Sequence, residues 1–170
     1  MNEKIQNVFL DTPFGASREE LIRNFAKHGF DVNKKISTED LVSFYPVDTT
    51  SYYRTSKKFY SFGGRSWKYL TVFINNGKFS VIKFQTSYND KAAALGDFES
   101  LLSDISKKYN VSEAEPRDTT VYKVHFGSDK QNREVEVYCE RGESVGGDLY
   151  YYVILRYEDL NISKEVSDEL

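Results

Sequence analysis

Two histidines and a single cysteine are the side chains best suited to nucleophilic chemistry in this sequence: His28, His125 and Cys139. Histidine titrates near neutral pH, and a base beside a thiol can activate it as a nucleophile. We expect His28 to be a helix-end cation and His125 to lie on the surface of a strand. A His125–Cys139 pair would require that their strands are neighbours. Cys139 alternates with Val135 and Val137, which predicts a core position, and a thiol in apolar surroundings is inert.

Three glutamates fall on one face of a predicted strand, namely Glu134, Glu136 and Glu140. Neighbouring carboxylates can hold a cation or act as an acid–base pair. We expect instead a solvated strand face that resists aggregation. The glycine pairs at 63–64 and 146–147 lack the spacing of a phosphate-binding loop and predict turns. The sequence therefore indicates no catalytic residue, no metal site and no cofactor, and it favours a role that is not enzymatic.

Charge and apolar patterning narrow the classes of partner. The formal net charge of −3 is too small to favour nucleic acid, which requires a basic surface. No stretch approaches the roughly 20 apolar residues of a transmembrane helix. One cysteine excludes an intrachain disulfide and a cysteine-rich zinc site. Residues 1–12 lack the apolar core of a signal peptide, so we expect either a cytoplasmic protein or one from which a signal has been removed.

Two amphipathic helices with defined ends are predicted. Ser17 and Glu20 form an S-x-x-E capping box at the start of the first helix. Gly29 is suited to end this helix because glycine adopts the left-handed conformation without a steric penalty. The second helix is predicted over about 91–109, where an apolar stripe recurs at helical spacing. Both helices are expected to be stabilised by burying their apolar stripes.

Period-two patterns predict three strands between residues 56 and 87, followed after the second helix by three more at about 119–126, 133–140 and 149–157. Asn76-Gly77 predicts a two-residue hairpin loop. That loop sets a register in which Ile74 faces Phe79, Val72 faces Val81 and Leu70 faces Lys83. Residues 31–55 fit either a short helix near 38–44 or an irregular strand.

The order of elements predicts a two-layer α+β fold in which two main helices pack on one face of an antiparallel sheet. We expect a single domain over 1–170. A helix-plus-three-strand unit occurs twice in this order, which suggests a tandem duplication with pseudo-repeats at 14–87 and 88–160. No repeat at the level of individual residues supports the duplication.

Aromatic side chains make up 15% of the chain and concentrate on the predicted strands. The central strands show no cleanly polar face, although a sheet covered on one side normally has one. Three explanations are open: residues 31–55 bury the second face, the face binds a partner, or it forms a homodimer contact. The candidate binding residues are Trp67, Tyr69, Phe73, Phe84, Tyr150 and Tyr152.

The stretches FGASREELIRNFAKHGF, FGGR and VFINNGK carry a resemblance to known proteins, mainly over residues 14–30 and 59–84. The pattern is similar to that of uncharacterised secreted proteins of gut Bacteroidetes. It more remotely resembles the β-lactamase-inhibitor-protein fold and the small lipoprotein of the outer-membrane assembly machine. The resemblance implies helices paired with an antiparallel sheet, protein binding, and a periplasmic or cell-envelope location. The chain departs from the inhibitor family in lacking paired cysteines, and no binding residue is carried over.

These observations favour a non-catalytic binding module that holds another protein, or a second copy of itself, through an aromatic sheet face. The alternative is a small-ligand or carbohydrate-binding protein, or an enzyme, that uses Glu and Tyr residues in a sheet-face cleft. That alternative requires a concave cavity of about 300 Å³ or more with convergent polar groups.

Overall fold

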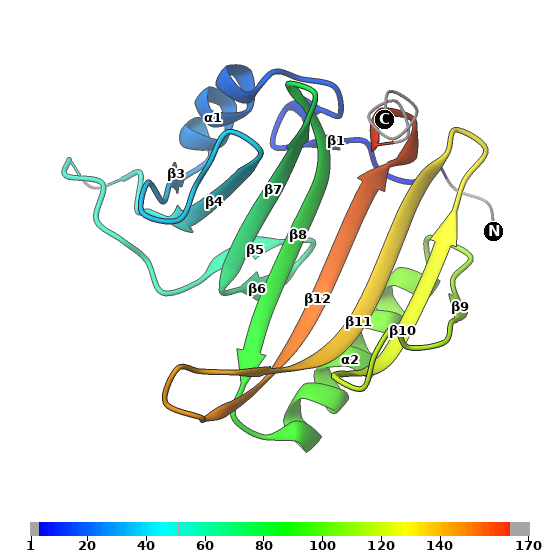
Figure 1. Ribbon diagram of the computed structural model, residues 1–170. Helices are drawn as coiled ribbons and strands as arrows, with labels where there is room; N and C mark the ends of the chain where they lie inside the picture. Colours follow the sequence, from blue (N-terminus) through cyan, green and yellow to red (C-terminus); the bar gives the residue numbers. More distant parts are fainter. Residues whose placement is uncertain (1–3, 51, 164–170) are drawn as a thin grey trace. The chain divides into compact units, whose positions relative to one another are not determined.

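The computed structural model describes residues 4–50 and 52–163, which belong to two compact units (Figure 1). The N-terminal unit contains residues 6–84 together with 158–163. The C-terminal unit contains residues 85–157 together with 4–5. None of the helices in the described part of the chain is long and apolar enough to cross a membrane.

The N-terminal unit consists of one helix and a four-stranded antiparallel meander. The helix is α1 (Arg18–Lys27), and the meander has the order β3-β4-β7-β8. Its strands are β3 (Phe30–Val32), β4 (Leu41–Pro46), β7 (Tyr69–Asn75) and β8 (Lys78–Tyr88), the last of which continues into the C-terminal unit. Two short ribbons complete the unit: β1 (Val8–Phe9) with β2 (Thr12–Pro13), and β5 (Tyr60–Phe62) with β6 (Arg65–Trp67).

Local signals set the ends of α1 as predicted. The Ser17 hydroxyl accepts a hydrogen bond from the backbone N–H of Glu20 at 3.2 Å. Gly29 follows the helix with a φ of +88°, a conformation that glycine adopts readily. Leu21 and Phe25 are buried, and the ring centroid of Phe25 lies 4.8 Å from that of Phe44 on β4. The short helix is therefore stabilised by its docked apolar stripe.

The hairpin prediction is confirmed at Asn76-Gly77, where the φ angles of 51° and 74° are those of a type I′ turn.

Residues 31–55, for which the sequence left both a helix and a strand open, contribute to strands β3 and β4. In the β4–β7 pair, Val42 faces Val72 and Phe44 faces Leu70. Of the three strands predicted between residues 56 and 87, only β7 and β8 belong to the meander. Residues 60–67 form the separate β5–β6 ribbon, and β3 and β4 complete the meander.

The C-terminal unit repeats this order of elements. Helix α2 (Lys91–Ser106) begins after Asp90, whose carboxylate accepts a hydrogen bond from the N–H of Ala93 at 3.2 Å. It packs on β11 through the buried side chains of Ala94, Phe98, Leu101 and Ile105. The strands lie in the order β9-β10-β11-β12, and are β9 (Ser112–Glu113), β10 (Val121–Ser128), β11 (Arg133–Glu143) and β12 (Leu149–Asp159).

The fold class is thus α+β with antiparallel strands, as predicted. In each unit a helix is followed by four strands that neighbour one another in chain order. The division between the units falls at residues 84 and 85, close to the predicted repeat boundary at 87 and 88. A common origin of the two halves stays a prediction.

Candidate functional site

Two of the predicted binding residues, Trp67 and Phe84, belong to the core. Trp67 is only 1% exposed and Phe84 is fully buried. The Phe84 ring stacks on Phe62 of β5 with 4.0 Å between centroids, and the Trp67 indole N–H donates to the carbonyl of Phe62 at 3.0 Å. The expectation that both rings are exposed as anchors is therefore wrong. The β5–β6 ribbon, and not residues 31–55, contributes the ring that covers Phe84.

The β4–β7 register shows which aromatic side chains face away from α1. Phe44 and Leu70 are paired and buried, and Phe44 contacts Phe25 of the helix. Side chains alternate along a strand, so the neighbouring residues point to the opposite face. That face carries Tyr45 (38% exposed), Tyr69 (43% exposed) and the half-buried Phe73. Two of the predicted residues, Tyr69 and Phe73, thus lie on a partly open face.

The connection between β4 and β5 carries two far more exposed tyrosines. It is the cyan segment that extends away from the strands of its unit in Figure 1. Tyr52 is 92% exposed and Tyr53 is 84% exposed, and their rings contact each other edge to face with centroids 5.1 Å apart. Both rings are therefore almost entirely in contact with water, outside the core of their unit. Sequence reasoning missed them because residues 31–55 carried no clear period.

Arg54 attaches this connection to the edge of the sheet. Its guanidinium Nε donates to Asp31 on β3 at 3.1 Å, and Nη2 donates to the carbonyl of Ala26 at 3.0 Å. The hydrogen bond to Asp31 raises the pKa of Arg54 above its usual value. Asp31 is paired with Tyr45 in the β3–β4 register. The residue that follows Tyr53 is thereby bound to β3, the strand that pairs with the one presenting Tyr45.

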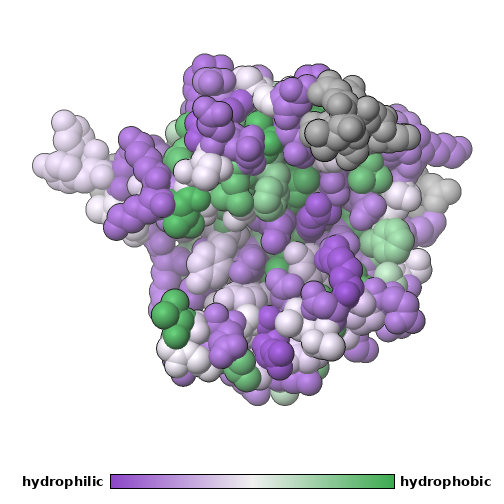
Figure 2. All heavy atoms as spheres, in the orientation of Figure 1, coloured by the Kyte–Doolittle hydropathy of each residue, from purple (hydrophilic) through white to green (hydrophobic). Residues whose placement is uncertain are grey.

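We call Tyr45, Tyr52, Tyr53 and Tyr69 the tyrosine surface. All four side chains belong to the N-terminal unit and are exposed. Figure 2 shows one face of the molecule, on which green and near-white spheres lie among purple ones in the region of β7 and β8. Part of the apolar and weakly polar side-chain surface is therefore open to contact.

The predicted residues Tyr150 and Tyr152 belong to the C-terminal unit. Both are half-buried. Tyr152 packs against the cluster of Val124, Tyr138 and Ile154, and a Cβ atom on Gly142 would lie 2.2 Å from its ring. Tyr152 therefore has a packing role on β12.

The expected solvated glutamate face is wrong, most clearly at Glu136, which is buried. The Arg117 guanidinium donates to the Glu136 carboxylate at 2.8 Å and lies 5.3 Å from the ring centroid of Tyr138. A cavity of about 280 Å³ lies beside this pair, lined also by Glu115, Phe126 and Glu134. Burial lowers the pKa of Arg117, but the hydrogen bond and charge of Glu136 outweigh it and raise the pKa. Glu136 is thus committed to an ion pair.

The His125–Cys139 pair does not form a nucleophilic site. Their strands are neighbours, but His125 faces Val137 and Cys139 faces Lys123. Burial raises the pKa of the Cys139 thiol to about 11, so the thiolate is disfavoured. The His125 ring lies 5.8 Å from that of Phe98 on α2. The expectation that His125 lies on a free strand surface is therefore wrong, because α2 covers that side of β10.

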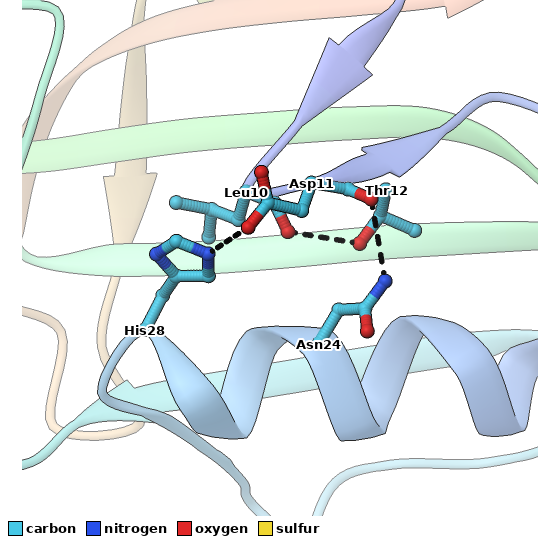
Figure 3. A network of polar contacts seen from close by, with 5 residues as sticks. All are labelled: Leu10, Asp11, Thr12, Asn24 and His28. Atoms are coloured by element: carbon cyan, nitrogen blue, oxygen red, sulfur yellow. Dashed lines mark hydrogen bonds and ion pairs between the residues drawn. The ribbon is translucent and has the colours of Figure 1, made fainter.

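His28, the last-turn cation of the sequence prediction, joins a network at the end of α1 (Figure 3). Its Nε2 lies 2.8 Å from an Asp11 carboxylate oxygen, and Asn24 donates to the backbone carbonyl of Asp11 at 3.3 Å. Thr12 donates to the carbonyl of Leu10 at 3.1 Å. Leu10 and Asp11 have φ angles of 50° and 63°, which are uncommon for residues other than glycine. The network ties the strained β1–β2 turn to the helix.

A cavity of about 320 Å³ lies next to His28, where the ends of α1, β4 and β5 meet; we call it the α1 cavity. Its lining includes Leu10, Phe30, Val47, Lys57, Phe59 and Tyr60. Tyr60 is only 6% exposed, and its hydroxyl has no hydrogen-bond partner among the described residues. Burial raises the pKa of this phenol well above its usual range. Tyr60 therefore remains a hydrogen-bond donor.

Among the described residues, no three or more His, Cys, Asp and Glu side chains lie close enough together to hold a metal ion. The α1 cavity and the tyrosine surface are two features of the described residues whose role in the fold does not account for them.

Comparisons with protein-family models, with curated proteins and with solved structures find no match to this chain.

Proposed function

We propose that this chain is a non-catalytic protein-binding module and that the tyrosine surface contacts its partner. The observation that carries the proposal is the near-complete exposure of Tyr52 and Tyr53, in a unit whose strands β4 and β7 also expose Tyr45 and Tyr69. Tyrosine is enriched among residues that dominate binding energy, because it offers a large, rigid ring and a polar tip.

The β4–β5 connection is attached to the rest of its unit through Arg54, and this attachment favours binding of a protein partner. Arg54 is held by Asp31 and by the end of α1, so the two neighbouring tyrosines start from a restrained backbone. Restraint of this kind reduces the entropy lost on association. None of the four tyrosines lines the α1 cavity or the cavity beside Glu136. The tyrosine surface is therefore not part of either of these candidate small-molecule sites.

The resemblance of the sequence to extracytoplasmic binding proteins supports the same class of activity and would place the partner in a bacterial cell envelope. The alternative of an enzyme that uses Glu and Tyr in a sheet-face cleft has less support. The cavity beside Glu136 has a suitable position, but Arg117 engages that carboxylate at 2.8 Å. An acid or base needs an available carboxyl group to exchange a proton with its substrate.

The test is site-specific photo-crosslinking in producing cells, with a photoreactive phenylalanine at position 52, 53 or 69, or at the control position Val145. Val145 is fully exposed in the turn between β11 and β12. We expect the three tyrosine positions to give one common cross-linked protein that is absent at position 145. A cross-link between copies of the chain identifies a homodimer contact instead, to be confirmed by analytical ultracentrifugation.

The captured protein is then purified and titrated with the full chain by calorimetry. The Tyr52→Ser/Tyr53→Ser variant should weaken binding by at least about tenfold, whereas Val145→Ser should leave the affinity unchanged. Both variants should retain the circular dichroism of the parent. Equal losses in the two variants, or no cross-link at any tyrosine position, would refute the proposal.

A further inference from the structure

We infer that the α1 cavity binds small organic carboxylates with an aromatic body. This inference concerns a surface that the proposed protein contact does not use, because the cavity is lined by other residues. Its volume of about 320 Å³ lies at the lower end of the range for small-molecule sites, which suits a ligand with one ring.

The first argument is the hydroxyl of Tyr60. A buried hydroxyl without a partner has a substantial desolvation penalty, and such groups are uncommon in folded proteins. The ring of Tyr60 is held edge to face against Phe30, with centroids 4.8 Å apart. The phenol therefore has little freedom to find another partner within the protein. An acceptor oxygen brought into the cavity would relieve the penalty.

The second argument is the ammonium group of Lys57. Its backbone N–H donates to the carbonyl of Pro46 at 2.8 Å, which holds the residue at the cavity. Its side chain is exposed, and it makes no ion pair with any residue in the described ranges. The other basic side chain of the lining, His28, already contacts the Asp11 carboxylate at 2.8 Å. Lys57 is thus the available cation of the site.

Together these two groups specify an anionic acceptor. A carboxylate has two oxygens and can accept from the Tyr60 hydroxyl and from the Lys57 ammonium, whereas a protonated amine has no acceptor for either donor. Charge-assisted hydrogen bonds are about twice as strong as neutral ones. No carboxylate side chain lines the cavity among the residues found there, so an incoming anion meets no like charge in its wall.

The remaining walls favour an aromatic body. Phe30 and Phe59 contribute rings, and Leu10, Pro46 and Val47 contribute aliphatic surface. Gly29 lets the chain turn closely past β4, since a Cβ atom there would lie 3.1 Å from the carbonyl oxygen of Val47. The His28–Asp11 and Asn24–Asp11 contacts hold Leu10 in place (Figure 3). The walls are therefore formed before a ligand arrives.

The test is a titration of the ¹⁵N-labelled full chain, followed by amide chemical shifts. The probes are benzoate and phenylacetate, with benzamide and phenylacetamide as uncharged controls of the same shape. We expect the carboxylates, at up to about 10 mM, to shift amides of residues 28–30 and 57–61. The amides should bind at least about tenfold more weakly.

Three variants identify the groups involved. Tyr60→Phe removes only the hydroxyl, Lys57→Gln removes the cation, and Lys35→Gln is the matched control, since Lys35 is exposed in the same unit and does not line the cavity. We expect Tyr60→Phe and Lys57→Gln to weaken benzoate binding by about tenfold each, and Lys35→Gln to leave it unchanged. Tyr60→Phe should keep or raise the melting temperature, because it removes an unpartnered buried hydroxyl.

Several results would overturn the inference: no shift with either carboxylate, equal binding of benzamide, or equal affinity of all three variants. A melting temperature lowered by Tyr60→Phe, with benzoate binding intact, would show that the hydroxyl serves the fold instead. The Tyr52→Ser/Tyr53→Ser variant should bind benzoate like the parent. Failure at the cavity and failure of the proposed protein contact are therefore distinguishable.

Discussion

Arg117 and Glu136 form an ion pair whose two members differ sharply in exposure. The Nη2–Oε1 distance is 2.8 Å, while the side chain of Arg117 is 58% exposed and that of Glu136 only 8%. The arginine comes from the segment between β9 and β10 and covers a carboxylate on β11. Burying an ionised carboxylate destabilises the folded state unless the carboxylate is paired. The ion pair with Arg117 therefore offsets the desolvation penalty of Glu136.

Arg117→Met should lower the free energy of unfolding by about 2–3 kcal/mol, because it leaves the Glu136 carboxylate buried without its partner. Urea denaturation measures the change. Arg141→Met is the matched control, since Arg141 is exposed in the same unit, and it should change the stability by less than about 0.5 kcal/mol. Equal losses in the two variants would mean that the ion pair has no special role.

Phe84→Ala should destabilise the protein by about 3–5 kcal/mol, because it leaves a cavity where the ring now stacks on Phe62. Tyr69→Ala, on the open strand face, should lower the stability by less than about 1 kcal/mol. Thermal and urea unfolding of both variants distinguish a core aromatic residue from a surface one. A comparable loss at Tyr69 would show that its face is covered.

Two glycines should respond to alanine with opposite signs. Gly77→Ala should destabilise by about 1 kcal/mol or more, because the type I′ turn holds this residue at a φ of +74°. Gly96→Ala should stabilise by about 0.5–1 kcal/mol, since Gly96 lies inside α2 and a Cβ atom there meets open space. Melting temperatures of the two variants should move in opposite directions from that of the parent.

Stability should fall at alkaline pH through Cys139. Burial, and after it the charge of Glu140, raises the pKa of the folded thiol to about 11. In the unfolded chain the thiol titrates near about 8.5. Between these values the folded state keeps a proton that the unfolded state has lost, so the free energy of unfolding decreases as the pH rises. Below pH 8.5 this contribution is fully present.

The Cys139→Val variant isolates this effect from the titration of other groups. Its stability should fall less than that of the parent when urea denaturation is repeated between about pH 8.5 and about pH 11. At about pH 8, a thiol reagent should modify the parent slowly when folded and rapidly in denaturant. Parallel stability curves for the two proteins, or rapid labelling of the folded parent, would contradict a buried thiol.

Local chemistry made several elements predictable from the amino-acid order. The N-cap at Ser17, the stop at Gly29 and the turn at Asn76-Gly77 all depend on groups within a few residues of one another. Such interactions do not depend on the rest of the fold. The α+β class and the core position of Cys139 followed from periodicity, because burial on one face imposes it on the chain.

The candidate sites depended on contacts between distant parts of the chain. Trp67 and Phe84 are buried because the β5–β6 ribbon supplies Phe62, and Glu136 is buried because Arg117 reaches it from another segment. Tyr60 and Lys57 line one cavity only when α1, β4 and β5 are assembled. Alternation along a strand assigns a side chain to one face of the sheet. It does not identify the segment that covers that face, because this segment can lie far away in the sequence. Exposure, and with it binding, is therefore set by packing between segments far apart in the chain.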